Sequence, residues 1–305
     1  MDKNEQVLRV VSISLGSSER NATAELELAG KKFIVERIGT DGNLRKAKEL
    51  LQSMDGKAAA FGLGGTDLYV YAGNNRYTFK ESADLIADVH KTPVLDGSGL
   101  KNSLERKVIN ELAKSGLVPL KGTKVLLVCG VDRFGMAEAL LENGAELTLG
   151  DLIFSLNINK PLHSLKALGF WAKILAPFIT RLPVSWFYPM GEDQEKRVVR
   201  HPEYFKENEI IAGDFHYIKK FMPEQLPGKI IITNTVTTAD REMLRKAGVK
   251  LLITTTPSLN GRSFGTNVME ALLVALNNSK AALSAEKYLE LLERYHIEAS
   301  VESLA

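Results

Sequence analysis

Residues 122–151 constrain the fold more than any other part of the chain. They open with an apolar run, 125–128, whose length and β-branched content are typical of a strand buried on both faces. A glycine-containing turn, 130–135, leads into a run of helix formers, 136–143, and a second strand follows at 146–149. A strand, a turn, a helix and a strand within about thirty residues predict the first unit of a parallel, Rossmann-like α/β sheet.

The turn departs from the usual dinucleotide fingerprint G-x-G-x-x-G at one position. Gly130 and Gly135 suit a tight turn and close helix packing, but Asp132 replaces the middle glycine. Asp151 follows Gly130 by about 20 positions, where an acidic side chain accepts hydrogen bonds from a ribose hydroxyl. A carboxylate at position 132 repels a pyrophosphate unless Arg133 or the helix N-terminus offsets its charge.

Two alternatives for this unit therefore stay open. It binds a dinucleotide, or it is a doubly wound domain without a cofactor. The residues predicted to bind the dinucleotide at this turn are Gly130, Asp132, Arg133, Phe134, Gly135 and Asp151.

Length, charge and cysteine content exclude several classes of protein. With 305 residues the chain is long enough for two domains. A net charge of +2 gives no strong basic field, so we expect no nucleic-acid partner. The single cysteine, Cys129, excludes an internal disulfide framework and a cysteine-based zinc site, and its place at a strand end favours a small buried side chain over a nucleophile. We expect no metal. Because residues 1–10 are charged and lack the apolar stretch of a signal peptide, we expect a cytoplasmic protein.

Residues 1–99 are predicted to form an N-terminal α/β substrate domain. Strands are expected at 7–15, 22–28, 33–38 and 58–63, a hairpin around 73–75, and helices at 44–54, with Asp41 as its cap, and at 82–90. The Gly64-Gly65 turn lacks the Gly-Lys-Ser/Thr sequence of a phosphate loop, so a tight strand exit is favoured.

The rest of the chain alternates between helices and strands. We predict a linking helix within 100–119, a Rossmann-like dinucleotide-binding domain at 120–280 and a C-terminal helix within 281–305, with a cleft between the two domains. Strands are expected at 210–212, 229–232 and 250–253, and helices at 238–246, 268–276 and 284–296.

Residues 162–190 are unusually apolar but are interrupted by Lys166, Lys173, Arg181, Pro177 and Pro183, which excludes a bilayer span. Such a face is more often a buried crossover, a subunit interface or the wall of an apolar pocket than a membrane surface. We expect no stable membrane insertion and a homo-oligomer.

The chemistry is expected beyond the carboxyl ends of the parallel strands, where ligands bind in open α/β sheets. Asp214 and His216 follow one strand and form an acid–histidine pair that could handle a proton. A histidine hydrogen-bonded in a loop is the alternative interpretation. Further predicted cofactor contacts at strand ends are Asn234, Thr254 and Thr255. Arg262, before a helix, suits an anionic group but could equally fix the loop. The predicted substrate-binding residues are Lys101, Arg262 and Asn267.

The motif Asp96-Gly97-Ser98-Gly99, followed by the linking helix, strand, glycine turn, helix and second strand, resembles the shikimate/quinate dehydrogenases. The resemblance covers residues 96–151. It implies that Asp96 is catalytic and acts with an upstream lysine on the hydroxyl that loses hydride to nicotinamide. Val94 and Leu95 stand where the family has Asn and Thr, and the family's lysine segment has no counterpart here: Lys57 lies at a similar distance but in another context.

The leading hypothesis is an NAD(P)-dependent oxidoreductase that acts on a small hydroxylated or carboxylated molecule. NAD is favoured over NADP, which remains possible, because Asp151 would repel a 2′-phosphate. The alternatives are a non-redox binding or sensor protein on the same fold, and an enzyme for an apolar or lipid substrate that uses residues 162–190.

Overall fold

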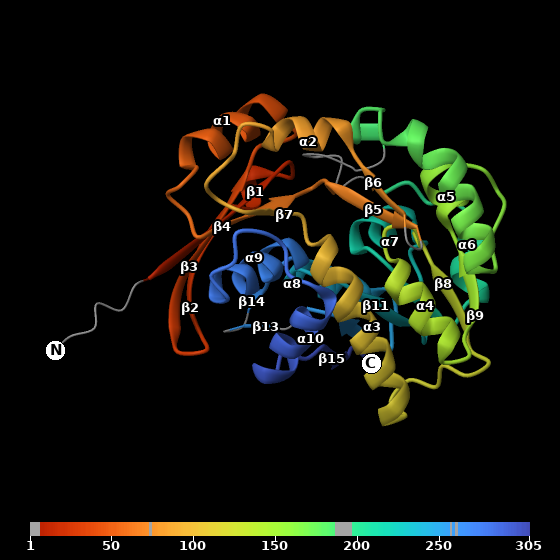
Figure 1. Cartoon of the computed structure of the whole chain (residues 1–305). Coiled ribbons are helices and arrows are strands. Elements are labelled where there is room, and N and C mark those ends of the chain that lie inside the picture. The colour runs from red at the N-terminus through yellow and green to blue at the C-terminus, as the bar shows by residue number, and fades with distance from the viewer. Residues whose placement is uncertain (1–6, 73–74, 187–196, 257, 260–261) are drawn as a thin grey trace.

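The protein is described by a computed structural model that covers residues 7–72, 75–186, 197–256, 258–259 and 262–305. This part of the chain contains two large, mainly parallel β-sheets with helices between and around them (Figure 1). The α/β class that the sequence predicts, with a Rossmann-like second sheet, is confirmed.

The first sheet has the strand order β2-β3-β1-β4-β7. Its strands are β1 (Leu8–Ser14), β2 (Ala22–Leu28), β3 (Lys31–Gly39), β4 (Ala60–Gly64) and β7 (Val94–Leu95). β1 pairs in parallel with β3 and β4, β4 pairs in parallel with β7, and β2 returns antiparallel to β3. The carboxyl ends of the parallel strands therefore meet at one edge.

Helices cover both faces of this sheet. α1 (Leu44–Met54) and α2 (Lys80–Ile86) lie on its outer face, where Val11 and Ile13 of β1 join their apolar cluster (Figure 1). α9 (Thr266–Leu276) packs on the other face, against β1 and β4. A helix that follows the last parallel strand of the second sheet thus packs against the first sheet, so residues far apart in the sequence share one core.

The second sheet has the strand order β15-β12-β11-β10-β8-β9. Its strands are β8 (Lys124–Leu127), β9 (Glu146–Leu149), β10 (Ile210–Ala212), β11 (Ile230–Thr233), β12 (Leu251–Thr254) and β15 (Ser300–Ser303). β15 is antiparallel to β12, and the other pairs are parallel. The chain leaves β8 toward β9 on one side and later returns as β10 on the other side, so a crevice is expected beyond the ends of β8 and β10.

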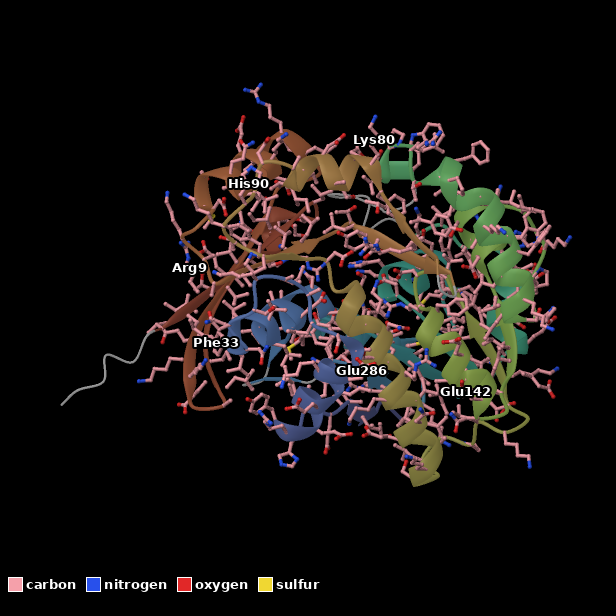
Figure 2. All side chains as sticks on the ribbon, in the orientation of Figure 1. Arg9, Phe33, Lys80, His90, Glu142 and Glu286 are labelled. Carbon is pink, nitrogen blue, oxygen red and sulfur yellow. The ribbon has the colours of Figure 1, made fainter. Side chains whose placement is uncertain are left out.

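Helices also cover both faces of the second sheet. On the side toward the first sheet lie α3 (Ser98–Ser115), α4 (Phe134–Glu142) and α10 (Ala285–Arg294), which share one continuous apolar core with α9. The other face is covered by α6 (Pro202–Glu207), α7 (Phe215–Phe221) and α8 (Thr238–Lys246). Figure 2 shows that side chains fill the space between these layers.

The segment after β9 forms helices instead of a further strand beside it. A π-helical turn, Asp151–Ser155, follows the strand directly, and α5 (Leu165–Ile179) and a short 3-10 turn (Val184–Trp186) come next. α5 lies at the periphery in Figure 1. Among the described residues, no helix is long and apolar enough to cross a bilayer. Residues 187–190 of the predicted apolar stretch, and 192–196 of the polar stretch after it, lie outside the described residues.

Most predicted elements are present, and the differences have local causes. The cap of α1 is Asn43, whose side chain accepts from Lys46 N, while Asp41 adopts a positive φ and accepts from Ser18 N instead. α6 and α7 were not predicted because they are too short for a helical period to show. The predicted C-terminal segment contains α10 and also a strand, β15, which pairs antiparallel with the edge of β12. The remaining small elements are β5 (Tyr69–Ala72) with β6 (Asn75–Thr78), β13 (Ser258–Leu259) with β14 (Arg262–Ser263), and a 3-10 turn (Ser18–Arg20).

Candidate functional site

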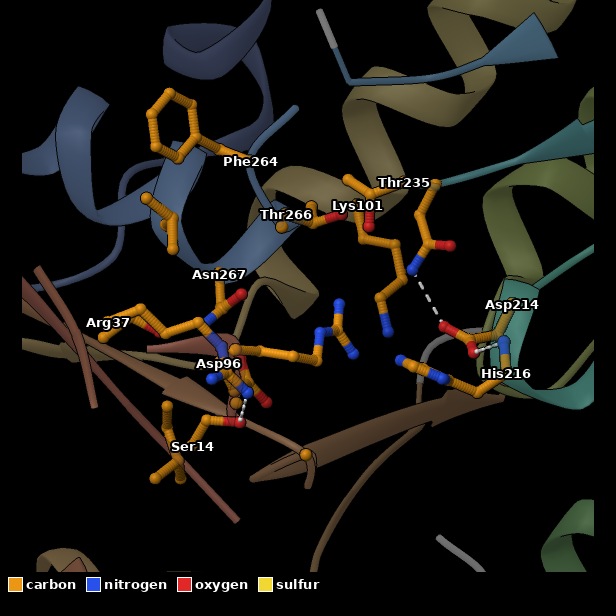
Figure 3. A pocket seen from close by; sticks show the side chains of 18 of the residues that line it. Ser14, Arg37, Asp96, Lys101, Asp214, His216, Thr235, Phe264, Thr266 and Asn267 are labelled. Carbon is orange, nitrogen blue, oxygen red and sulfur yellow. Dashed lines mark hydrogen bonds between the residues drawn. The ribbon is translucent and has the colours of Figure 1, made fainter. Parts of the chain in front are cut away.

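A polar cavity of about 480 Å³ lies where the carboxyl ends of the two sheets face each other. The first sheet contributes the ends of β1 and β4, and the second contributes the ends of β8, β10 and β11. The start of α9 and the first turn of α3 complete the walls (Figure 3). A cleft therefore lies between the two sheets, and residues from Ser12 to Val268 line it.

Lys101 lies on the floor of this cavity, in the first turn of α3, and is almost fully buried. Its Nζ is 2.7 Å from Oδ1 of Asp132 and 3.4 Å from Oδ1 of Asp67. Burial disfavours the ammonium, but these two carboxylates outweigh burial and raise the pKa of Lys101 above its usual value. Asp67 follows β4 and Asp132 follows β8, so the Lys101–Asp67–Asp132 cluster joins the two sheets through α3.

Asp132 holds a proton near neutral pH. Burial, and next to it the charge of Asp67, raise the pKa of Asp132 to about 8, although Lys101 works in the opposite direction. Two carboxyls that share one proton beside one ammonium are neutral as a group, which limits the cost of burying them.

Asp96 lies at the edge of the cavity with both oxygens occupied. Oδ2 accepts from the backbone N–H of Leu68 and Tyr69, at 2.7 and 3.1 Å, and Oδ1 accepts from both the N–H and the hydroxyl of Ser98. Burial, followed by the charge of Asp67, raises the pKa of Asp96. Four hydrogen bonds use the acceptor capacity of a carboxylate. Asp96 therefore fixes the loop that carries Asp67 and the start of α3.

The glycines of the D-G-x-G motif let α9 approach closely. Gly97 has φ +93°, and a Cβ there would lie 2.8 Å from the backbone N of Asn267. A Cβ on Gly99 would lie 2.5 Å from Oε1 of Glu270. Glu270 in turn accepts from the Gly97 N–H and from the Tyr288 hydroxyl, so the motif fastens α3, α9 and α10 together.

The glycine turn after β8 is filled by the chain itself. The Gly130 and Val131 N–H groups donate to the two oxygens of Asp151, at 3.0 and 2.8 Å, and the Arg133 N–H donates to the Gly130 carbonyl. A Cβ on Gly130 would lie 3.1 Å from Leu168 of α5. A pyrophosphate would sit at the N-terminus of α4 and needs close approach of the backbone at the middle glycine of the fingerprint, where Asp132 stands. Because Asp132 occupies that position and both Asp151 oxygens already accept from the turn, the residues of this turn do not fit a dinucleotide.

The other residues predicted at this turn are engaged in packing. Gly135 allows close contact between α4 and α3, because a Cβ there would lie 2.6 Å from the Asn102 carbonyl oxygen. Phe134 packs, partly buried, against the main core. Burial, with Asp151 as a second cause, raises the pKa of the Cys129 thiol. The side chain is only partly buried and lines the cavity, whereas the sequence predicts a buried one.

Arg133 is fully buried and joins the predicted acid–histidine pair to the turn. It forms ion pairs with Glu105 and, at 3.0 Å, with Oδ2 of Asp214. Burial would raise the pKa of Asp214, but His216 and Arg133 outweigh it and lower that pKa to about 2. Burial lowers the pKa of His216 despite the nearby Asp214. His216 is therefore mainly neutral at pH 7, and its ring points into the same space as Lys101 (Figure 3).

Asn234 and Asn267 also line the cavity. The Asn234 amide donates to Asp214 at 2.9 Å, and the Asn267 amide donates to the Ser12 hydroxyl at 3.1 Å. Thr254 and Thr255 are buried behind the cavity and do not line it. The backbone of Arg262 lies in β14, and its side chain is outside the described part of the structure.

Among the lining residues that were not identified from the sequence are four polar ones, Arg20, Arg37, Thr266 and Asp67, whose positions depend on the packing of the two sheets. Arg37 on β3 donates to the Ser14 hydroxyl and the Ser17 carbonyl. Burial, with neighbouring Arg20 as a second cause, lowers the pKa of Arg37 to about 10. Thr266 Oγ1 is buried and has no hydrogen-bond partner among the described residues. The fourth is Asp67, and its place after Gly64-Gly65 was the one available signal.

Within the described part of the chain, no group of three or more histidine, cysteine or acidic side chains is arranged to hold a metal ion. The cavity instead offers two arginines on its first-sheet side and the Lys101–Asp67–Asp132 cluster on its floor. Guanidinium groups pair well with carboxylate or phosphate, while a lysine–carboxyl cluster can exchange a proton with a hydroxyl or carbonyl group.

Similarity to solved structures is broad and weak. L-tryptophan dehydrogenase from Nostoc punctiforme is 13% identical over 97% of this chain and 81% of its own, with a TM-score of 0.40. The NAD-dependent malic enzyme from Thermotoga maritima is 13% identical over 94% and 83%, with a TM-score of 0.36. The glucose-galactose binding protein GanP from Geobacillus stearothermophilus is 11% identical over 98% of both chains, also at 0.36. Such likenesses assign no activity to this chain.

The search of curated proteins found no significant sequence match. Two family models match the sequence. One, described as Domain of unknown function (DUF8753), matches residues 9–96, and another, described as Domain of unknown function (DUF8754), matches residues 99–304. Because the second match covers more than half of the sequence, this chain belongs to the family described as Domain of unknown function (DUF8754).

Proposed function

We propose that this protein binds a small hydroxylated carboxylic acid between its two sheets and moves a proton at a hydroxyl or carbonyl group of that ligand. The observation that carries the proposal is the Lys101–Asp67–Asp132 cluster, in which an ammonium lies between two carboxyls on the floor of a polar cavity. Burying three ionisable side chains costs free energy, and such clusters in a cleft are typical of functional sites.

The groups of the cluster have complementary roles. Asp132, with a pKa of about 8, can both give and accept a proton near neutral pH. Lys101 stays positively charged and stabilises an oxygen that becomes negative as the proton leaves. Asp67 keeps the Asp132 proton in place until the ligand arrives. A neutral His216, which faces the same space, can accept or donate a further hydrogen bond.

The other end of the ligand is expected on the first-sheet side. Arg37 lines the cavity with its guanidinium anchored on Ser14, and Arg20 lies close enough to lower the pKa of Arg37. Two guanidiniums that repel each other are stabilised by an anion between them. The buried Thr266 hydroxyl supplies a hydrogen-bonding group without a partner among the described residues.

A second candidate is the oxidoreductase that the sequence predicts, an NAD(P)-dependent enzyme on the same kind of acid, similar to the quinate and shikimate dehydrogenases. The Lys101–Asp67–Asp132 cluster beside the D-G-x-G motif favours it, because a lysine–carboxylate pair suits oxidation of an alcohol. The glycine turn opposes it, since Asp132 stands where the backbone must approach a pyrophosphate and both Asp151 oxygens already accept from the Gly130 and Val131 N–H groups.

Calorimetric titration tests both candidates. Small hydroxy acids are expected to bind the wild-type protein, and the variant Lys101→Met is expected to lose that binding. The control Lys107→Met removes a lysine from the same helix whose partner is Glu111, and it should bind as wild type. No uptake of any hydroxylated acid would contradict the proposal. Titration with NAD(H) and NADP(H) decides the second candidate, which fails if neither binds at millimolar concentration.

A further inference from the structure

Helix α5 is apolar on both of its faces. Leu168, Ala172 and Ala176 are buried and pack inward, where Leu168 covers the glycine turn. The opposite face carries Phe170 and Phe178, which are exposed. A helix that is apolar on two opposite faces normally buries both, and the described residues do not cover the outer face of α5.

The exposed apolar side chains are large and close together. Phe170 is 61% exposed, Ile174 43% and Phe178 69%, and their spacing of four residues places them in one stripe along the helix. Trp186, in the short turn after α5, is 68% exposed. Side chains project from this helix away from the rest of the molecule in Figure 2. Apolar patches of this kind usually mark a binding surface.

Positive charges flank the stripe. Lys166 and Lys173 are exposed on α5 beside the stripe, and Arg181, also exposed, follows just after the end of the helix. Residues 160–186 contain no aspartate or glutamate. We call the surface formed by these three cations with Phe170, Ile174, Phe178 and Trp186 the α5 face.

This charge pattern distinguishes between two possible binding partners of the α5 face, a second copy of the chain and a lipid surface. In a two-fold dimer built on the α5 face, each copy would place Lys166, Lys173 and Arg181 against the same cations of its partner, which costs free energy. An anionic lipid surface accepts the cations at its headgroups while aromatic and aliphatic side chains enter the acyl boundary. Long basic side chains reach outward to the headgroups from such a position.

We propose that the α5 face binds the surface of an anionic membrane, with α5 lying in the interface plane. At 15 residues α5 is too short to cross a bilayer, so the protein would be held at the surface. The proposal is independent of the function assigned to the cavity, which lies between the two sheets.

Vesicle sedimentation tests this inference on the full-length protein. Vesicles of phosphatidylcholine and phosphatidylglycerol in equal parts are expected to carry the protein down, while pure phosphatidylcholine vesicles leave it in solution. Raising the salt concentration should weaken binding. Each basic residue near an anionic surface contributes roughly fivefold in affinity, so Lys166→Glu with Lys173→Glu should weaken binding by about 25-fold or more. Phe170→Ser with Phe178→Ser should weaken it at least about tenfold.

A matched control removes the same kinds of side chain elsewhere. Lys114→Glu with Leu117→Ser alters an exposed lysine and a 49% exposed leucine near the end of α3, and it should bind vesicles as wild type does. Since all six substituted side chains are exposed, unchanged circular dichroism is expected throughout.

Three results would overturn the proposal. The protein could stay in solution with anionic vesicles at low salt, or the α5-face variants could sediment as well as wild type. Light scattering without lipid could instead show a dimer that Phe170→Ser with Phe178→Ser dissociates, which would assign the α5 face to a second copy of this chain.

Discussion

At the scale of single residues, the cluster formed by Lys101, Asp67 and Asp132 contains the most unusual electrostatics of the cavity. Its members come from three separate segments, and their charges balance only when the carboxyl pair keeps one proton. The sequence identified Lys101 and Asp132 individually, but not their contact. The sequence predicts Asp132 as a cofactor-binding residue whose charge opposes a phosphate, whereas the structure pairs it with the Lys101 ammonium.

The raised pKa of Asp132 predicts a pH-dependent stability. Because the folded-state pKa of about 8 exceeds the ordinary value of 3.8, this group stabilises the fold fully below about pH 4, and the contribution is lost as the pH rises through 8. The slope is at most about 1.4 kcal/mol per pH unit. Denaturation of wild type and Asp132→Asn at several pH values measures how the free energy of unfolding depends on pH. Wild type should lose stability relative to the variant between pH 4 and 8, and a constant difference would contradict the assignment.

Asp96 is predicted to matter for stability through the backbone groups it satisfies. Asp96→Ala leaves the buried N–H groups of Leu68 and Tyr69 without their acceptor, which should cost about 2–5 kcal/mol in the free energy of unfolding. Urea denaturation measures the loss. Asp88→Ala serves as control, since it removes an exposed carboxylate that contacts the side chains of Lys48 and Gln52, and it should cost much less. Equal losses would mean that the Asp96 hydrogen bonds contribute little.

At the scale of elements, glycines mark positions where two helices are in close contact. A Cβ on Gly135 would meet the Asn102 backbone in α3, which cannot move aside cheaply, whereas a Cβ on Gly169 in α5 meets nothing within 4 Å. Gly135→Ala should therefore destabilise the protein by about 1–3 kcal/mol, and Gly169→Ala should stabilise it by about 0.5–1 kcal/mol. Thermal or urea unfolding of both variants checks the opposite signs. A gain from Gly135→Ala would mean that α3 and α4 are less tightly packed.

Local patterns predicted most helices and strands, and they failed where tertiary packing decides. The β8–α4–β9 unit follows from its apolar run and glycines. The role of α5 does not follow from its sequence, because a helix with two apolar faces can pack against many partners. The position of Leu168 beside Gly130 shows that α5 closes the glycine turn. The short helices α6 and α7, which pack on the face of the second sheet away from the first, show no helical period in the sequence.

At the scale of the whole molecule, the cavity depends on the placement of α9. This helix follows the last parallel strand of the second sheet but packs on β1 and β4 of the first sheet. It so brings Thr266 and Asn267 beside Ser12 and the ends of both sheets. Asp214, Asn234 and Lys101 were expected near a cleft from their strand or helix ends. Arg37 and Asp67 could not be placed there, because no local pattern specifies which edges of two sheets will face each other.

The protonation state of Asp132 tests the central claim most directly. Carbon-13 NMR of side-chain carboxyls, with Asp132→Asn used to assign the signal, follows this one group through a pH titration. A carboxyl that titrates near pH 8 in the wild-type protein, and that shifts when Lys101 is replaced by methionine, is the result expected from the buried cluster. A signal that titrates near pH 4, or one whose titration is unchanged in Lys101→Met, would contradict the assignment of a buried Lys101–Asp67–Asp132 cluster.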